Sequence, residues 1–143
     1  MREINFRVWS NRNKEMINVN ECEVFLDFNG KVYATGIDEY GDVEYFEVED
    51  IELLQYTGLN DKNGKKIHEG DIFSHHFTEK LKGIVKYGEH QNVMHGDRFG
   101  GNVGFYIEWN DDVTRNDLLY WIKISEVIGN IYENADLLNT NTL

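Results

Sequence analysis

Residues 54–72 have the sequence LQYTGLNDKNGKKIHEGDI, and this stretch decides the fold of the chain. Its middle part, residues 61–64 (Asp-Lys-Asn-Gly), predicts a tight polar turn, because Asn and Gly tolerate the positive φ that such turns require. Residues 69–72 (Glu-Gly-Asp-Ile) then open an apolar strand that continues through Phe73. A further apolar strand is predicted at residues 83–87, about a dozen residues on. The stretch therefore predicts an antiparallel meander.

The same signals extend outward from this centre. The chain contains 13 glycines and no proline, so glycine and asparagine mark the turns between short β-branched and aromatic runs. Residues 4–9 alternate between apolar and polar side chains, which predicts a half-buried strand. Asn29-Gly30, between residues 24–28 and 32–34, predicts a hairpin. Two segments stay open: residues 48–55 fit a short helix or a strand, and residues 112–120 fit a helix or a loop.

Three pieces of the sequence carry a resemblance to a known family. The first is residues 6–9 (Phe-Arg-Val-Trp) followed by Met16-Ile17. The second and most specific is residues 55–59, 61–65 and 69–72, and the third is residues 127–134 (Val-Ile-Gly-Asn-Ile-Tyr-Glu-Asn). In this order the pieces resemble the YopX-like family of bacteriophage and prophage proteins, over residues 6–134.

This resemblance implies a fold and a biological setting, but no catalytic residue. It implies an SH3-like β-barrel toward the C-terminus and a role in a temperate phage or prophage. Together with the turn spacing, it predicts a mainly β fold with little helix, in one YopX-like domain. Its expected parts are an N-terminal β-hairpin region, the barrel and a flexible tail, at residues 1–60, 67–134 and 139–143.

Length and composition are consistent with one domain, or with a small barrel that carries an appended subdomain. The chain has 143 residues, 41% of them apolar, and a formal net charge of −12. It contains no run of 18 apolar residues, and its first residues lack the apolar stretch of a signal peptide. Cys22 is the only cysteine, which excludes a disulfide within the chain and favours a reducing compartment. We therefore expect a cytoplasmic protein of the host cell that does not bind membranes.

The residue types needed for catalysis are present without a recognisable arrangement. His75, His76, His90 and His95 lie close together in the sequence. However, adjacent residues of a strand point to opposite faces, and no known zinc-ligand spacing occurs. The chain also lacks a phosphate-binding glycine motif and a nucleophile motif. We therefore expect no enzyme activity, no cofactor and no metal site, with histidines that are solvated in loops and strands.

Acidic side chains form the one unusual pattern. From residue 32 to residue 61 there are nine Asp and Glu residues and no Lys or Arg. Such a surface repels the DNA backbone, so we expect no direct binding to duplex nucleic acid. One interpretation is a solvated face that keeps the protein soluble. The other is an interaction surface, for which the candidate residues are Asp42, Glu44, Glu47, Glu49 and Asp50.

The functional hypothesis is a non-enzymatic protein-interaction module with a protein partner of host or phage origin. The alternative is an acidic antagonist, or DNA mimic, that binds a nucleic-acid-processing protein. Homo-oligomerisation is compatible with both, because it is a common way to cover edge strands. An exposed cluster around Trp9, Trp109 or Trp121 would instead indicate a peptide groove or a subunit interface.

Overall fold

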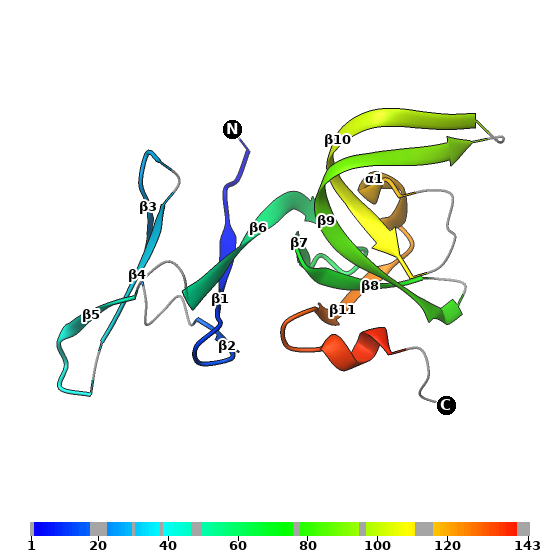
Figure 1. Ribbon diagram of the computed structural model, residues 1–143. Coiled ribbons are helices and arrows are strands. Elements are labelled where there is room, and N and C mark those ends of the chain that lie inside the picture. Colours follow the sequence, from blue (N-terminus) through cyan, green and yellow to red (C-terminus); the bar gives the residue numbers. More distant parts are fainter. Residues whose placement is uncertain are drawn as a thin grey trace. The chain divides into compact units, whose positions relative to one another are not determined.

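The fold of the chain comes from a computed structural model. It describes residues 2–17, 23–29, 31–37, 39–46, 50–75, 78–94, 97–110 and 116–139. The strands are β1 (Phe6–Ser10), β2 (Glu15–Met16), β3 (Glu23–Leu26), β4 (Val32–Ile37), β5 (Val43–Phe46), β6 (Ile51–Asn60), β7 (Lys66–His68), β8 (Asp71–His75), β9 (Thr78–Met94), β10 (Asp97–Trp109) and β11 (Glu126–Asn130). The helices are short: α1 (Leu118–Trp121) and the 3₁₀ helix η2 (Ala135–Leu138) (Figure 1). The predicted mainly β fold is confirmed.

The described chain divides into two compact units. The small unit, residues 6–54, contains β1 to β5 and the start of β6. The large unit, residues 1–5 and 55–143, contains the rest of β6 and all later elements. Of the tail expected at residues 139–143, only Asn139 belongs to the described residues. Within the part of the chain that the structure describes, no helix has the length and apolar character needed to span a membrane.

The large unit is built on an antiparallel sheet with the strand order β10-β9-β8-β11. Figure 1 shows this sheet as strongly curled, with β9 and β10 as a long hairpin and α1 against β10. The curled sheet lies within the region predicted as a barrel, residues 67–134, and its SH3-like character stays a prediction. The curl encloses one apolar core, made of Ile67, Phe73, Val85, Ile107, Trp109, Leu118 and Trp121.

The small unit contains a second antiparallel sheet with the order β3-β4-β5. The hairpin predicted around Asn29-Gly30 is confirmed as β3 paired with β4. Gly30 itself lies outside the described residues. The carboxylate of Asp27 organises this turn, because its Oδ1 accepts the backbone N–H groups of Asn29 and Lys31 at 2.9 and 2.8 Å. The turn thereby brings residues 23–26 opposite residues 32–35.

Strand β6 passes from the small unit into the large one. It lies between β1 and β7 in a sheet of order β2-β1-β6-β7. The segment 48–55, which fitted a helix or a strand, therefore contributes a strand from Ile51 onward. Pairing with neighbouring strands decides the structure here, because the local sequence fits a helix and a strand about equally well. In the other open segment only Leu118–Trp121 is helical, and residues 111–115 lie outside the described residues.

Candidate functional site

The predicted acidic surface begins at the connection between β4 and β5. Asp42 directly precedes β5, Glu44 lies within it, and Asp50 directly precedes β6; all three are exposed. Glu47 and Glu49 lie outside the described residues. Alternation along β5 directs Glu44 to the face opposite that of Val43. The acidic side chains of β5 and its turn therefore do not all point the same way.

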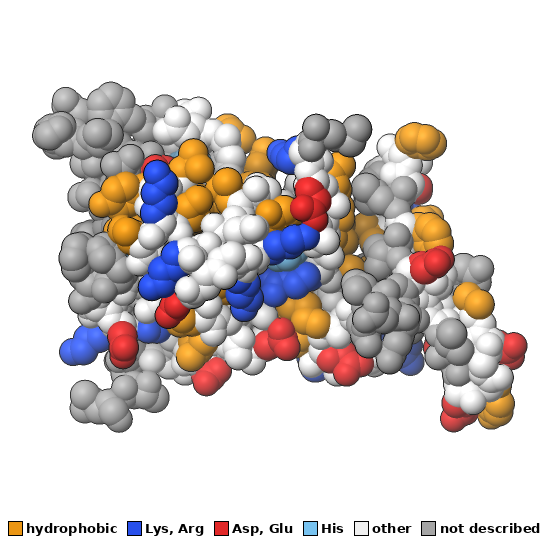
Figure 2. Space-filling view, turned by 180° about the vertical axis from the view of Figure 1, so that it is seen from behind, with side chains coloured by type: hydrophobic (Ala, Val, Ile, Leu, Met, Phe, Trp, Pro, Cys, Tyr) orange, Lys and Arg blue, Asp and Glu red, His pale blue; other side chains and the backbone are white. Residues whose placement is uncertain are grey.

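Charge is distributed unequally between the two units. Residues 6–54 contain four basic and twelve acidic side chains, a net charge of −8. Residues 1–5 and 55–143 contain ten basic and fourteen acidic side chains, a net charge of −4 over almost twice the length. In Figure 2, acidic and hydrophobic side chains lie next to one another around β3, β4 and β5, at the right. The small unit is therefore the more acidic one by a wide margin.

One face of the β3-β4-β5 sheet also exposes apolar side chains, which the sequence reasoning did not predict. Phe25 is directly opposite Tyr33, and Ile37 is directly opposite Val43, so these positions share one face. Phe25 is 50% exposed, Tyr33 37% and Val43 62%. The sequence predicted a hairpin here, but neither its register nor whether one of its faces is covered.

This face also carries charged groups. Glu23, which is exposed, pairs with Thr35 one step along the same face. The ammonium of Lys31 lies over the ring of Tyr33, 5.4 Å from its centroid. Such a cation is attracted by the negative face of the ring. We call the set Glu23, Phe25, Tyr33, Thr35 and Val43 the aromatic face.

The three tryptophans, in contrast, are buried. Trp9, Trp109 and Trp121 are all among the core residues. Trp109 and Trp121 contact each other edge to face, with ring centroids 4.9 Å apart. They therefore do not form the exposed cluster that would have indicated a peptide groove. Among the residues whose side chains the structure describes, the exposed aromatic ones are Phe25, Phe28, Tyr33, Tyr40, Tyr87 and Tyr120.

The two described histidines of the histidine-rich segment, His75 and His90, pack against aromatic rings. The ring of His75 lies 5.2 Å from Trp109 and 4.8 Å from Trp121. His90 stacks on Tyr106 at 4.9 Å. His76, His95 and Cys22 lie outside the described residues. Among the residues that the structure describes, no three potential ligands of a metal ion come together. The expectation of no metal site stays a prediction.

In the large unit, polar side chains of the stretch 54–72 form hydrogen bonds with backbone N–H groups. Asp61 is buried, and its Oδ1 accepts the N–H groups of Asn63 and Lys65, each at 2.9 Å. Its Oδ2 accepts the N–H of Val127 at 3.0 Å. The carboxylate thus closes the turn predicted at residues 61–64 and ties it to β11. Asp61 belongs to the acidic run in the sequence but to the interior in the structure.

The Glu-Gly-Asp entry of β8 has a similar role. The Oδ2 of the buried Asp71 accepts the backbone N–H of His68 at 2.8 Å. The ring of His68 is hydrogen-bonded through Nε2 to Asn5 at 3.0 Å. Gly70 adopts a φ of +85°, which permits the sharp bend between β7 and β8. These residues therefore position the strands around the core.

The third piece of the resemblance, residues 127–134, forms a side-chain-stabilised turn. The Oδ1 of the buried Asn130 accepts the N–H groups of Tyr132 and Glu133 at 3.0 and 2.9 Å. Asn134 in turn accepts the N–H of Asn130 through its Oδ1 at 3.1 Å. A Cβ on Gly129 would lie 2.8 Å from Cγ of Asn134, so a side chain does not fit at residue 129. These residues of the resemblance therefore shape the backbone.

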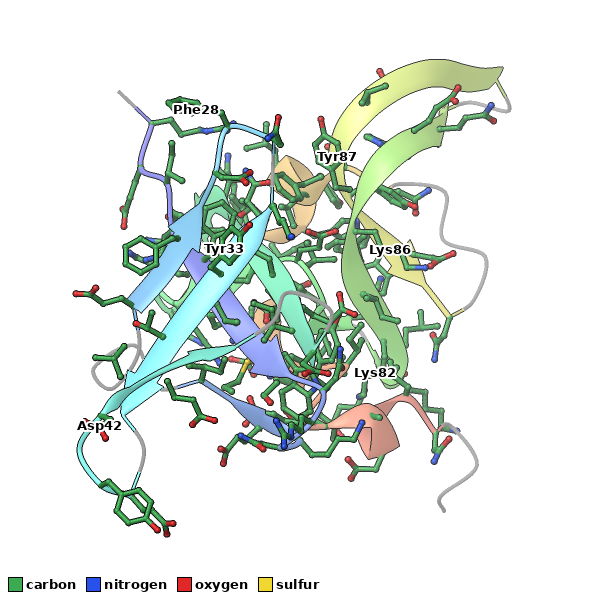
Figure 3. All side chains as sticks on the ribbon, turned by 60° about the vertical axis from the view of Figure 1, so that its left-hand side comes forward. Phe28, Tyr33, Asp42, Lys82, Lys86 and Tyr87 are labelled. Carbon is green, nitrogen blue, oxygen red and sulfur yellow. The ribbon has the colours of Figure 1, made fainter. Side chains whose placement is uncertain are left out.

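Basic side chains of the large unit lie along β9, where Figure 3 labels Lys82 and Lys86. Lys86 forms an ion pair with Glu108 of the neighbouring strand β10. Its hydrogen bond to Glu108 raises the pKa of the Lys86 ammonium above the ordinary value, against a smaller opposing effect of burial. A hydrogen bond to Glu3 raises the pKa of Lys66 in the same way. Lys66 and Lys86 are therefore charged and partnered at neutral pH.

The chain is similar to proteins of known structure. One match is the crystal structure of protein EF1440 from Enterococcus faecalis, with 25% sequence identity and a TM-score of 0.52. The match covers 97% of this chain and 100% of that one. The crystal structure of protein yopX from Bacillus subtilis has 17% identity and a TM-score of 0.56, over 97% of this chain and 98% of that one. The second likeness is one of fold alone.

The remaining comparisons concern sequence. None of the curated proteins compared with the chain matches it. The family model described as YopX protein matches residues 5–139. This match contains all three pieces of sequence that carry the resemblance, and it covers both compact units. The chain belongs to the YopX protein family.

Proposed function

We propose that this chain is a non-enzymatic protein-interaction module, an accessory protein of a phage or prophage that acts in the cytoplasm of the host cell. The observation that carries the proposal is the composition of the small unit. It concentrates a net charge of −8 in 49 residues and exposes apolar side chains on a sheet face. Exposed apolar groups next to charges are typical of surfaces that bind other proteins.

The arrangement of the large unit supports the same proposal. The most distinctive polar side chains of the family-like stretches, those of Asp61, Asp71 and Asn130, are buried and bind backbone N–H groups. Their chemistry is thus used to form the fold. The exposed acidic side chains of the small unit lie at its surface, where a partner can reach them.

A second candidate is an acidic antagonist that occupies the nucleic-acid site of its partner. The observation that favours it is the exposure of Asp42, Glu44 and Asp50 in a segment without basic residues between positions 32 and 61. Carboxylates on such a surface attract the Lys and Arg side chains that otherwise bind phosphates. Competition by duplex DNA for the partner distinguishes this candidate from a module that binds elsewhere.

The test compares two triple charge reversals that change the net charge equally. The first is Asp42→Lys with Glu44→Lys and Asp50→Lys in the small unit; the second is Glu79→Lys with Glu89→Lys and Asp136→Lys in the large unit. All six residues are exposed, and each triple variant changes the net charge from −12 to −6. Tagged proteins are recovered from host cells after nuclease treatment, and captured partners are identified by mass spectrometry.

We expect a stoichiometric protein partner that is lost with the small-unit variant and retained with the large-unit variant. Calorimetry with the purified partner then measures the affinity directly, and we expect at least a tenfold loss for the first variant only. Recovery of the bait alone would contradict the proposal. Equal losses with both variants would contradict the assignment to the small unit, because binding would then follow net charge.

A further inference from the structure

The aromatic face of the β3-β4-β5 sheet combines two features that recognise the same kind of group. Phe25 and Tyr33 form a cross-strand aromatic pair, and both rings are substantially exposed. The carboxylate of Glu23 lies on the same face, two pairs further along β3 and β4. Figure 3 shows Tyr33 near the end of the β3–β4 hairpin and Asp42 toward the opposite end of the sheet. Two exposed rings and a carboxylate therefore lie together on this face.

The structure contains an internal example of what such a surface binds. The Lys31 ammonium lies over the Tyr33 ring at 5.4 Å from the centroid. A ring that holds a cation within its own chain offers the same electrostatic attraction to a cation of a partner. Arginine fits this surface better than lysine, because its planar guanidinium stacks on aromatic rings and pairs with carboxylates in a bidentate way.

A second copy of the chain is a poor occupant. It would place one small unit of net charge −8 against another. Juxtaposed like charges oppose association, whereas a positively charged surface is attracted and steered toward the face. Charge complementarity therefore selects a basic occupant with apolar stems that cover Phe25 and Val43.

We propose that the aromatic face is the docking site for an arginine-bearing protein surface. The guanidinium groups stack on Tyr33 and Phe25 and pair with Glu23, while Lys31 is displaced from the Tyr33 ring. This inference deepens the proposed function and rests on it, since it assigns the binding of the module to one face and one partner chemistry.

The probe is a fluorescein-labelled dodecapeptide with four Arg-Leu-Gly repeats, and its binding is followed by fluorescence anisotropy. Phe25→Ala with Tyr33→Ala removes both rings and leaves the net charge unchanged. The matched control is Tyr87→Ala with Phe105→Ala, the directly opposed aromatic pair on β9 and β10. We expect the first double variant to weaken binding at least tenfold and the second less than twofold. Equal effects, or none from the first variant, would overturn the assignment.

Lys31→Met provides a test that misfolding cannot imitate, because it is expected to increase binding. Removing the Lys31 ammonium frees the face of the Tyr33 ring. The control is Lys62→Met in the large unit, which changes the net charge equally at an exposed site. We expect the affinity for the arginine peptide to rise at least threefold with Lys31→Met and less than twofold with Lys62→Met. Equal increases would show that only net charge matters and would contradict the proposal.

Two further measurements separate this inference from the proposed function. If the arginine peptide binds no better than a Glu-Leu-Gly counterpart, while the charge reversal at Asp42, Glu44 and Asp50 still removes a protein partner, the face assignment is wrong and the proposed function stands. Sedimentation equilibrium tests the remaining occupant. A wild-type assembly that Phe25→Ala with Tyr33→Ala converts to monomers would make the face a self-association surface and overturn the basic-partner assignment.

Discussion

At the scale of single residues, we expect loss of the Asp61 carboxylate to lower the free energy of unfolding strongly. This carboxylate is buried and accepts backbone N–H groups from Asn63, Lys65 and Val127. Asp61→Ala leaves these donors without their charged acceptor, and each such bond contributes about 1.5–3 kcal/mol. We therefore expect the free energy of unfolding to fall by about 3 kcal/mol or more, measured by urea denaturation with tryptophan fluorescence.

Asp27→Ala is the matched control at the residue scale. The Oδ1 of Asp27 accepts the N–H groups of Asn29 and Lys31 in the same pattern, but at an exposed turn and without a distant partner. Water replaces the lost acceptor there, so we expect a loss below about 1 kcal/mol. Similar losses for the two variants would show that the bond to Val127 contributes little.

The same residues show what the sequence can and cannot predict at this scale. The turn at Asn63-Gly64 was predictable, because its chemistry is local. The burial of Asp61 was not, since its partner Val127 is 66 positions away and nothing near Asp61 marks it as different from the other acidic residues. An acidic run in a sequence therefore mixes interior and surface carboxylates.

At the scale of elements, Gly83 is required where β9 crosses the core. A Cβ at this position would overlap Cγ2 of Ile107 and lie 2.9 Å from Cε3 of Trp109, both in the neighbouring strand. The side chains of a packed core cannot withdraw without further losses. We expect Gly83→Ala to lower the free energy of unfolding by about 3 kcal/mol, the upper end for overpacking, in chemical denaturation experiments.

Gly64→Ala is the comparison for Gly83→Ala. Gly64 has a φ of +82° in the β6–β7 turn, and its Cβ would meet open space. The cost there is backbone strain alone, about 1 kcal/mol. If both variants lost the same stability, steric overlap at β9 would not be the cause.

The presence of strands and turns followed from the sequence more readily than the covering of faces did. Asn-Gly turns and apolar runs predicted the hairpin of β3 and β4 and the strands around residues 72 and 85. The aromatic distribution was not predictable in the same way. Tryptophans entered the core of the large unit or became buried in β1, while Phe25 and Tyr33 stayed exposed. Which face of a sheet is covered depends on tertiary packing.

At the scale of the whole molecule, the residues that shape the backbone and most of the net negative charge lie in different units. The stretch 54–72 and the C-terminal motif shape the backbone of the large unit, whose core they surround. The small unit carries most of the net negative charge. A resemblance based on backbone-shaping residues therefore predicts a mainly β fold and gives little information on the exposed surface of the small unit.

The distribution of buried apolar residues predicts unequal local stability. Among the residues whose burial the structure describes, the continuous core cluster consists of large-unit residues, among them Phe73, Val85 and Ile107. Local opening costs least where few apolar contacts are broken. In hydrogen exchange monitored by mass spectrometry, we expect amides of β8, β9 and β10 beside this core to exchange at least tenfold more slowly than those of β3, β4 and β5.

Phe73→Ala tests the same point, because it lowers the free energy of unfolding by about 3–5 kcal/mol. It should accelerate exchange in β8 to β10 and leave exchange in β3 to β5 unchanged. Equal protection in wild type, or equal acceleration in the variant, would mean that the two units open as one cooperative structure.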